Sequence, residues 1–371
     1  MTNPNRPHPM MEQVPVPIRR STLSALLALA LRPALALAIA AGPVAAIAQE
    51  KVLNLYSARH YQTDEALYAN FTRQTGIRIQ RIEAGDEALL ERLRSEGRNS
   101  PADVVLLVDA ARLWKAQSEG LFQPLRSPAL EARIPANLRG PDEGKGSEWF
   151  AYSTRARIIV YNRATVQPDQ VRQYADLAQP TLKGKVCTRS GTHPYMLSLI
   201  GALAEHLGEA AAEQWARGVV ANFARSPRGG DTDQIKAVAS GECGVALTNS
   251  YYLARLMRST RAEDREIVAR IGVVMPDQAG RGTHMNVSGG AIARHAPHRD
   301  AAAAFLEYLA SDEAQRLFAD GNNEWPVVAS VKIGNPALEA LGSFRQDKLP
   351  IGQIGRAQLA AARIIDRAGW R

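Results

Sequence analysis

The 371 residues of this chain are enough for two domains, and an apolar content of 46% is ordinary for a folded protein, which excludes a disordered chain. The formal net charge is +8, of which residues 1–48 contribute +3 and the remaining chain +5. Lysine and arginine form no long run, so a nucleic-acid partner is not expected.

The N-terminal residues have the pattern of a secretory signal peptide. Arg19 and Arg20 precede an apolar stretch over 23–41, which leads to an A-x-A site at 46–48. An arginine and a proline interrupt the apolar stretch, which argues against a membrane span of about 20 apolar residues. We predict export, by the general or the twin-arginine route, and cleavage after Ala48.

Strands and helices alternate in the first part of the remaining chain. Apolar or alternating runs predict strands at 52–57, 77–82 and 103–108, with helices at 64–74 and 87–96 between them. The third run contains V-V-L-L-V, which is typical of a strand covered on both faces. This alternation predicts an α/β sheet, in which ligands gather at the carboxyl ends of strands.

The second part of the chain continues the alternation around one long strand. Residues 151–162 are predicted to form a strand that is long enough to cross between two lobes. Asp231 to Asp233 can cap a helix over 234–240. Further strands are predicted at 185–187, 244–247, 271–276 and 289–293, and further helices at 196–207, 253–257, 301–309 and 312–318.

The two cysteines, Cys187 and Cys243, are expected to form one disulfide in an oxidising compartment. Such a bridge would close a loop of 57 residues, and loop-entropy models assign it about 4 kcal/mol. A cysteine-based metal site is not expected, because neither cysteine lies in a C-x-x-C motif.

Tyrosines follow predicted strands at three points of the chain. Tyr251 and Tyr252 lie between a strand and a helix. Adjacent side chains point to opposite faces of a strand, but they lie only about 100° apart at the start of a helix, so both phenols can converge only at such a turn. Tyr195 begins another helix, and Tyr61 follows the first strand together with His60. Packing or helix capping is the alternative role for each of these residues.

Four short motifs, taken together, give the chain a family resemblance. They are S-A-R-H-Y at 57–61, R-A-R-I-I-V-Y-N at 155–162, S-G-T-H-P-Y at 190–195 and N-S-Y-Y at 249–252. In this combination the chain resembles the bacterial periplasmic ferric-iron-binding proteins, which are the substrate-binding subunits of ABC iron transporters, and in particular the branch with a His-Tyr pair. The resemblance extends from the first predicted strand to about Trp325.

The resemblance implies a two-lobed periplasmic binding protein fold of type II, with the ligand cleft at the hinge. Lobe 1 would comprise residues 49–156 and 272–305, and lobe 2 would comprise 157–271. The C-terminal helical segment, 306–371, would pack on lobe 2. The implied function is capture of ferric iron in the periplasm and delivery to an inner-membrane ABC permease with its ATPase. The mature protein would be a monomer without enzymatic activity that does not span the membrane.

The motifs also imply a set of site residues. The implied iron ligands are His60, Tyr61, Tyr195, Tyr251 and Tyr252. Arg155 and Arg59 are expected beside these ligands, where they would balance negative charge. Asp109, which follows the 103–108 strand, is the nearest match to a carboxylate ligand of other branches and is expected around the site. A bound anion is a further candidate ligand.

The chemistry of these donors agrees with the implied cargo. Phenolate is a hard, anionic oxygen donor, which suits a hard trivalent cation. A free tyrosine has a pKa near 10, so phenolates at neutral pH require a strong local cation. Four phenolates around one ferric ion leave a net charge of −1, which Arg155 or Arg59 would balance. The residues alone do not select Fe³⁺ over Fe²⁺.

Two other classes of function are considered on the residues alone. The same fold could bind a small organic or anionic solute, such as a polyamine, a phosphonate or thiamine, but five Tyr and His donors fit such a solute poorly. An exported hydrolase would need a nucleophile elbow, and neither Ser190 nor Ser288 lies in one. His284 has no partner at metal-ligand spacing and is predicted to be structural.

Overall fold

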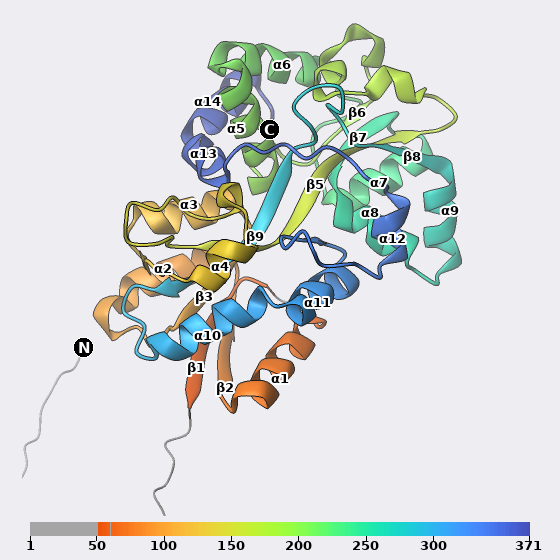
Figure 1. Cartoon of the computed structure of the whole chain (residues 1–371). Coiled ribbons are helices and arrows are strands. Elements are labelled where there is room, and N and C mark those ends of the chain that lie inside the picture. The colour runs from red at the N-terminus through yellow and green to blue at the C-terminus, as the bar shows by residue number, and fades with distance from the viewer. Residues whose placement is uncertain (1–50, 60) are drawn as a thin grey trace, which may run out of the picture. The chain divides into compact units, whose positions relative to one another are not determined.

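One mixed sheet runs through the part of the chain that the computed structural model describes, residues 51–59 and 61–371 (Figure 1). Its strands are β1 (Val52–Ser57), β2 (Arg78–Glu83), β3 (Val104–Leu107), β4 (Phe122–Gln123), β5 (Phe150–Asn162), β6 (Val186–Cys187), β7 (Val245–Asn249), β8 (Ile271–Val274), β9 (Met285–Ala293) and β10 (Trp325–Pro326). They follow the order β2-β1-β3-β9-β5-β7-β6, while β4 pairs with β9, and β8 and β10 pair with β5. The predicted signal peptide and His60 lie outside the described residues.

The first three strands form the parallel part of the sheet that the sequence predicts. β1 is parallel to both β2 and β3. Parallel neighbours require a crossover, and α1 (Asp64–Thr75) and α2 (Asp86–Glu96) supply it. Gly76 ends α1 at φ 70°, a left-handed conformation that glycine adopts without steric strain. All four residues of β3 are buried, as its apolar sequence predicts.

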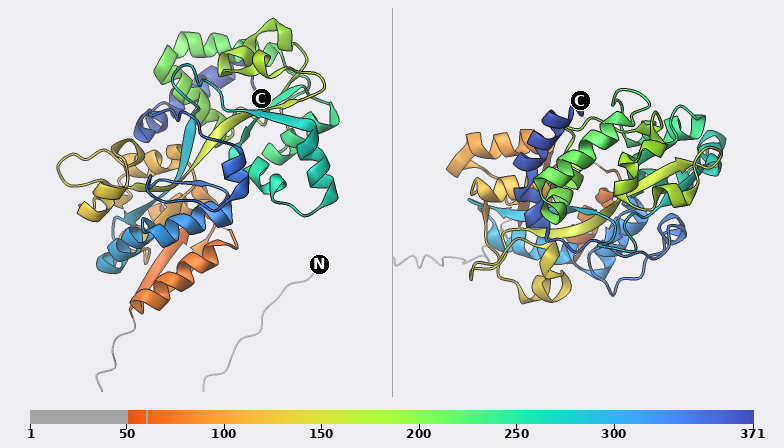
Figure 2. Two further views of the ribbon diagram at one scale, coloured as in Figure 1. Left: turned by 45° about the vertical axis from the view of Figure 1, so that its right-hand side comes forward. Right: turned by 90° about the horizontal axis from the view of Figure 1, so that it is seen from above.

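β5 changes its pairing partners along its length. Its first half, up to Ala156, is antiparallel to β9, and its second half, from Arg157, is antiparallel to β7 and β8. In Figures 1 and 2, β5 and β9 run from the segment of β1 to β3 toward the segment that carries α5 (Pro194–Leu207) to α9 (Ala262–Arg270). The predicted long strand is therefore the element that joins the two parts of the sheet.

Three clusters of buried apolar side chains form the core of the described chain. The first lies around β1, β3, β9, α1 and α10 (Arg299–Leu309). The second lies around α5, α6 (Glu209–Ala221) and α14 (Gln358–Ala368). The third lies around β7, α7 (Asp231–Ser240) and α8 (Ser250–Met257). The first cluster belongs to one part of the sheet, and the other two belong to the other part.

The C-terminal residues contribute to all three clusters. Phe318 lies in the first, Ile364 in the second and Leu338 in the third. The assignment of segment 306–371 to lobe 2 therefore stays a prediction. The remaining helices are α3 (Ala110–Ser118), α4 (Pro128–Arg133), α11 (Asp312–Asn322), α12 (Pro336–Ala340) and α13 (Ile351–Arg356). No helix among residues 51–59 and 61–371 combines the length and the apolar character needed to cross a bilayer.

The predicted disulfide is present. Cys187 at the end of β6 is bonded to Cys243, which precedes β7, and their Cα atoms lie 5.9 Å apart. The bridge lies in the third cluster and ties the beginning of the loop that carries Tyr195 to the segment that leads to Tyr251.

The start of α7 differs from the prediction. The helix begins at Asp231 rather than at residue 234, with Gly230 as its N-cap. Asp233 caps the first turn by accepting a hydrogen bond from the Gly230 N–H at 2.7 Å. The Asp231 carboxylate does not cap the helix, because it is bound instead by side chains from other elements, as described below.

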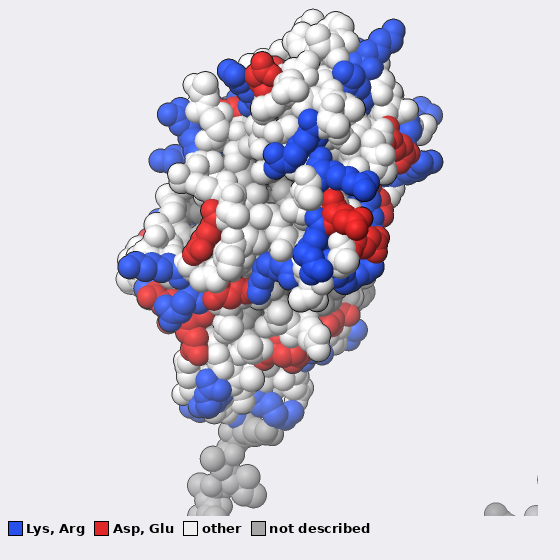
Figure 3. Space-filling view, turned by 90° about the vertical axis from the view of Figure 1, so that its right-hand side faces the viewer, with Lys and Arg blue, Asp and Glu red and all other residues white. Residues whose placement is uncertain are grey.

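Charged side chains of both signs are interspersed on the face that Figure 3 shows. Lysine and arginine lie next to aspartate and glutamate there, with uncharged surface between them. This distribution differs from the continuous basic stripe that is typical of nucleic-acid binding.

Candidate metal centre

Three of the four predicted tyrosine ligands lie in the first turn of a helix. Tyr195 is the second residue of α5, and Tyr251 and Tyr252 are the second and third residues of α8. Tyr61 lies in the loop between β1 and α1. Each of the four therefore follows the carboxyl end of a strand, which is where the sequence predicts a ligand site.

The structure brings three of these phenols together and links the fourth, Tyr61, to them through two arginines. The hydroxyl oxygens of Tyr195 and Tyr251 lie 3.0 Å apart, which is hydrogen-bonding distance. The ring centroids of Tyr251 and Tyr252 lie 4.2 Å apart, and the ring planes are inclined by 31°. Arg59 lies over the Tyr61 ring and binds Glu324, and the same carboxylate lies 3.6 Å from Arg155, which lies over the Tyr195 ring. The two tyrosine-bearing turns therefore face one shared region.

Burial makes three of the phenols, those of Tyr61, Tyr195 and Tyr251, harder to deprotonate. It raises the pKa of Tyr61 to about 12, and the neighbouring Glu324 adds to this effect. Burial also raises the pKa of Tyr195, against the opposing influence of the Arg155 cation. The pKa of Tyr251 lies well above its ordinary value, first because of burial and then because of the other phenols. Without a cation these groups are neutral, since desolvation penalises the charged form.

Arg155 lies beside the phenols, where the sequence predicts a balancing charge. Its side chain is buried, and its guanidinium carbon lies 5.8 Å from the centroid of the Tyr195 ring. One nitrogen, Nη1, donates to Ser288 Oγ at 2.8 Å and lies 3.6 Å from Glu324 Oε1. The other two nitrogens, Nε and Nη2, have no hydrogen-bond partner within the described chain. Buried donors without a partner are rare in native structures, so this guanidinium can donate hydrogen bonds to a further negative group.

Arg59, the other predicted cation, is held by two carboxylates. Its guanidinium donates to Asp64 Oδ2 at 2.9 Å and to Glu324 Oε2 at 3.2 Å. It also lies over the Tyr61 ring, with 5.0 Å between its central carbon and the ring centroid. Arg59 therefore positions Tyr61 through its ring, and its charge is already paired.

Glu324 is a buried carboxylate that sequence reasoning missed. It lies between Arg59 and Arg155 and also accepts a hydrogen bond from Ser153 Oγ at 2.7 Å. The available signal was a single glutamate directly before the buried Trp325 strand. A charged residue at such a position is buried only when it is paired.

Asp109 lies around the site, with its carboxylate fully engaged. It caps α3 by accepting from the Ala111 N–H at 2.8 Å, and it accepts from Asn286 Nδ2 at 2.8 Å. Ser198 Oγ on α5 lies 3.2 Å from both of its oxygens. Burial raises the pKa of Asp109, and Arg155 opposes that shift. Both carboxylate oxygens of Asp109 are therefore engaged in hydrogen bonds that hold neighbouring elements together, and neither is free to bind a metal.

The loop before α5 adds two residues around Tyr195. His193 caps the helix, because its Nδ1 accepts from the Tyr195 N–H at 3.2 Å. Burial, with a contribution from the Arg189 cation, lowers the pKa of His193 to about 3. Arg189 lies over the Tyr195 ring, with 5.1 Å between its guanidinium carbon and the ring centroid. Sequence reasoning missed Arg189.

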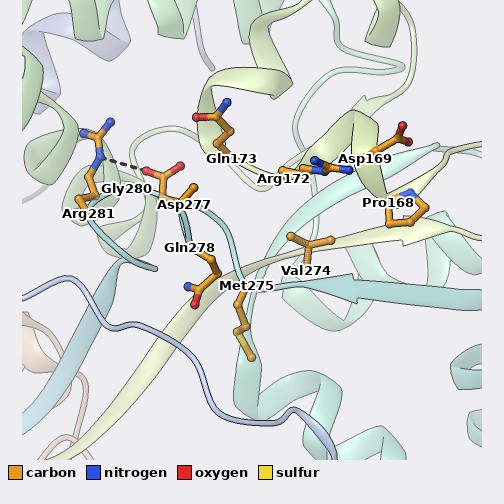
Figure 4. A pocket seen from close by; sticks show the side chains of 11 residues that line it. Pro168, Asp169, Arg172, Gln173, Val274, Met275, Asp277, Gln278, Gly280 and Arg281 are labelled. Carbon is orange, nitrogen blue, oxygen red and sulfur yellow. Dashed lines mark ion pairs between the residues drawn. The ribbon is translucent and has the colours of Figure 1, made fainter.

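Two other features of the described chain differ from the phenol cluster. No group of three or more His, Cys, Asp or Glu side chains within residues 51–59 and 61–371 could hold a metal. A cavity of about 630 Å³ is lined by Val274, Met275 and Arg172, and by an Asp277–Arg281 ion pair of 3.0 Å (Figure 4). None of the four tyrosines lines this cavity. The phenol cluster is therefore the candidate metal centre.

Comparison with known proteins decides the family. The family model described as bacterial extracellular solute-binding protein matches residues 53–321. The chain belongs to this family. One relative is the iron uptake protein A1 of Synechocystis, which is 45% identical over 323 residues, 87% of this chain and 88% of the relative.

Solved structures of solute-binding proteins agree with the fold. A Trichodesmium protein in complex with iron and citrate ligands matches with a TM-score of 0.82 and 50% identity, over 86% of this chain and 100% of that chain. The Bordetella ferric binding protein matches with a TM-score of 0.79 and 38% identity, over 86% and 99% of the two chains. The chain therefore has the two-lobed α/β fold of the periplasmic ferric-binding proteins.

Proposed function

We propose that this solute-binding protein captures ferric iron with Tyr61, Tyr195, Tyr251 and Tyr252, together with His60. The observation that carries the proposal is the 3.0 Å distance between the hydroxyl oxygens of Tyr195 and Tyr251, with the Tyr252 ring 4.2 Å from the Tyr251 ring. Relatives that are named for iron uptake or for ferric iron binding support the identity of the cargo.

A donor set of phenols favours a small and highly charged cation. Zinc sites are built mainly from Cys and His, and calcium sites from carboxylates and carbonyls, and the phenol cluster has neither pattern. A phenolate oxygen is a hard anionic donor, so it binds most strongly to a hard ion such as Fe³⁺. The buried phenols must also lose their protons, which only a strong local cation makes favourable at neutral pH.

The surrounding charges suit a ferric complex. Four phenolates and one Fe³⁺ carry a net charge of −1, and a surplus charge in a buried site requires a partner. Arg155 has two unpaired nitrogen donors and lies over the Tyr195 ring, so it can supply that partner. Arg155 could also bind an anion that enters with the metal, such as the citrate of the Trichodesmium complex.

The site draws its donors from both proposed lobes. We place lobe 1 at residues 49–156 and 272–305 and lobe 2 at 157–271, so that the chain passes from lobe 1 to lobe 2 within β5. Tyr61 then belongs to lobe 1, and Tyr195 and the Tyr251–Tyr252 pair belong to lobe 2. Only a closed arrangement of the lobes satisfies all donors at once, so iron binding would favour closure.

The proposed route of the cargo follows from the family. Relatives include a protein named as an Fe(3+)-binding periplasmic protein and one named as a probable ABC transporter periplasmic-binding protein. We propose that the chain is exported with cleavage after Ala48, acts in the periplasm as a monomer without enzymatic activity, and delivers iron to an inner-membrane permease with its ATPase.

The test is an equilibrium titration of the purified chain from residue 49 onward. Ferric citrate should produce a visible phenolate-to-iron charge-transfer band that saturates at one iron per chain. Ferrous iron under anaerobic conditions, a polyamine, a phosphonate and thiamine are titrated in parallel. Saturable binding of one of the organic solutes, with no band from ferric citrate, would replace the iron proposal with the small-solute function.

A further inference from the structure

The Asp231 carboxylate joins the two turns that carry the tyrosines of the candidate site. Asp231 is the first residue of α7 and is completely buried. Its hydrogen bonds go to Arg157, Arg189 and Asn249 and not to the tyrosines. Three groups from three other elements bind it. This arrangement is what displaces the start of α7 from the sequence prediction.

The first connection leads to the Tyr251–Tyr252 turn. Asp231 Oδ2 accepts a hydrogen bond from the backbone N–H of Asn249 at 2.7 Å. Asn249 is the N-cap of α8, so this bond fixes the residue from which the helix starts. The direction of the first turn of α8 sets where both phenols point.

The second connection leads to the Tyr195 turn. Asp231 Oδ1 accepts from Arg189 Nη1 at 3.1 Å, and the same guanidinium lies 5.1 Å from the centroid of the Tyr195 ring. Arg189 belongs to the loop between β6 and α5, so its ion pair holds that loop against the start of α7. The Asp231 carboxylate therefore orients the Arg189 guanidinium over the Tyr195 ring.

The third connection fixes Asp231 itself to the long strand. Arg157 on β5 donates from Nη1 to Asp231 Oδ2 at 2.6 Å and to Asn249 Oδ1 at 3.1 Å. Its Nη2 lies 3.2 Å from the sulfur of Met196, the residue after Tyr195. Arg157 and Asp231 are both buried, and removing one member of a buried pair leaves the other charge without compensation.

We propose that Asp231 is a positioning residue that sets the separation of the Tyr195 and Tyr251 hydroxyls, and through it the affinity and geometry of the bound ferric ion. This inference rests on the proposed function. One carboxylate binds both tyrosine-bearing turns. Its loss should therefore change the position of Tyr195 relative to the Tyr251–Tyr252 pair. Partners that orient metal ligands from outside typically change metal affinity by about 10–100-fold when they are removed.

The main test variant is Asp231→Asn, which keeps the shape of the side chain and removes its charge. Ferric affinity, measured by competition with citrate, should fall by roughly 10–100-fold. At saturating iron the charge-transfer band should also shift in wavelength or intensity, because the geometry of the phenolates around the metal changes. A merely structural role would lower the melting temperature of the iron-free protein and leave that band unchanged.

A second variant separates the two connections. Arg189→Gln removes the link to the Tyr195 loop and keeps the bonds from Asp231 to Arg157 and Asn249. It should alter the band and lower ferric affinity in the same direction, and it carries the test if Asp231→Asn does not fold. The matched control is Asp366→Asn, at an exposed aspartate in α14, which should leave affinity and band unchanged.

The outcomes distinguish this inference from the function on which it rests. No charge-transfer band in the unaltered protein overturns the proposed function. A normal band in the unaltered protein, with the same band and affinity in Asp231→Asn or Arg189→Gln, overturns the positioning role alone.

Discussion

The hydroxyl oxygens of Tyr195 and Tyr251 lie 3.0 Å apart, although the two residues begin different helices and are 56 positions apart in the chain. Two phenols at this distance share one hydrogen bond while both are protonated. Loss of both protons would place two negative oxygens side by side, which is favourable only if a cation lies between or beside them. The pair is therefore stable without a metal, and under the proposed function both oxygens would lose their protons on binding iron.

Replacing either hydroxyl should weaken iron binding. Tyr195→Phe and Tyr251→Phe each remove one anionic donor, and we expect ferric affinity to fall by at least about 100-fold in each, which exceeds the usual effect of an outer partner. The measurement is competition with citrate, followed in the charge-transfer band. Tyr152→Phe is the control, because the buried Tyr152 hydroxyl has no hydrogen-bond partner within the described chain. Normal affinity in both site variants would exclude these tyrosines as ligands.

Iron binding should release protons and strengthen as the pH rises. The pKa of Tyr61 is raised to about 12 by burial, and the pKa values of Tyr195 and Tyr251 are raised for the same first reason, so the free site holds its phenol protons at neutral pH. Each phenol that becomes a ligand must lose one proton, so low pH favours the free protein. Proton release per iron can be measured in weakly buffered solution, and Tyr251→Phe should lower it by about one. Affinity that does not change with pH would contradict phenolate ligation.

Removal of the Arg155 cation should destabilise the loaded site more than the empty one. Its Nε and Nη2 have no partner within the described chain, and its guanidinium lies over the Tyr195 ring. Arg155→Ala should therefore lower ferric affinity by about 10–100-fold. The melting temperature measured with and without iron separates the two states. If the iron-dependent increase in melting temperature is the same as in the unaltered protein, the balancing role is wrong.

His284 should destabilise the fold in acid. It is buried, neither ring nitrogen has a hydrogen-bond partner within the described chain, and burial lowers its pKa from 6.5 to about 4, against an opposing effect of Asp347 and with contributions from Arg157. Because the folded-state pKa is the lower one, the unfolded chain binds the proton first. The contribution of neutral His284 to the unfolding free energy is fully present above about pH 6.5. Below that pH the unfolding free energy falls by up to about 1.4 kcal/mol per pH unit, down to about pH 4.

The check on His284 is denaturant unfolding across this range. His284→Leu should flatten the loss of unfolding free energy between pH 6.5 and about 4, because no imidazole remains to be protonated. Stability above pH 7 should change much less. An equally steep acid limb in the variant would assign the loss to other groups.

Reduction of the Cys187–Cys243 disulfide should lower the unfolding free energy by up to about 4 kcal/mol, because the unfolded chain regains the freedom of a long loop. Urea unfolding with and without reductant measures the effect. The Cys187→Ser/Cys243→Ser double variant should match the reduced protein and be insensitive to reductant. Equal stability of the oxidised and reduced forms would show that the bridge does not stabilise the fold.

Local sequence patterns predicted most of the fold. The phenols follow predicted strands, so the general rule for α/β sheets placed each of them where a ligand can bind, and the family resemblance implied that they share one site. The pattern could not predict the buried carboxylates, because their partners lie far away in the sequence. Glu324 pairs with Arg59, and Asp231 binds Arg157, Arg189 and Asn249.

The misplaced start of α7 has the same cause. In isolation, the cluster Asp231-Thr232-Asp233 is a typical helix cap, and nothing nearby distinguishes its two carboxylates. The long-range bond from Arg157 takes Asp231, so Asp233 caps the helix instead. Tertiary ion pairs override local capping preferences here, as expected when a buried charge must be paired.

Anomalous diffraction at the iron edge, on crystals of the ferric-loaded protein, tests the central claim most directly. We predict a single strong peak within coordination distance of the hydroxyl oxygens of Tyr61, Tyr195, Tyr251 and Tyr252, and the same map tests whether His60 is a ligand. An iron peak elsewhere, or a loaded crystal with no peak among these four oxygens, would contradict the account.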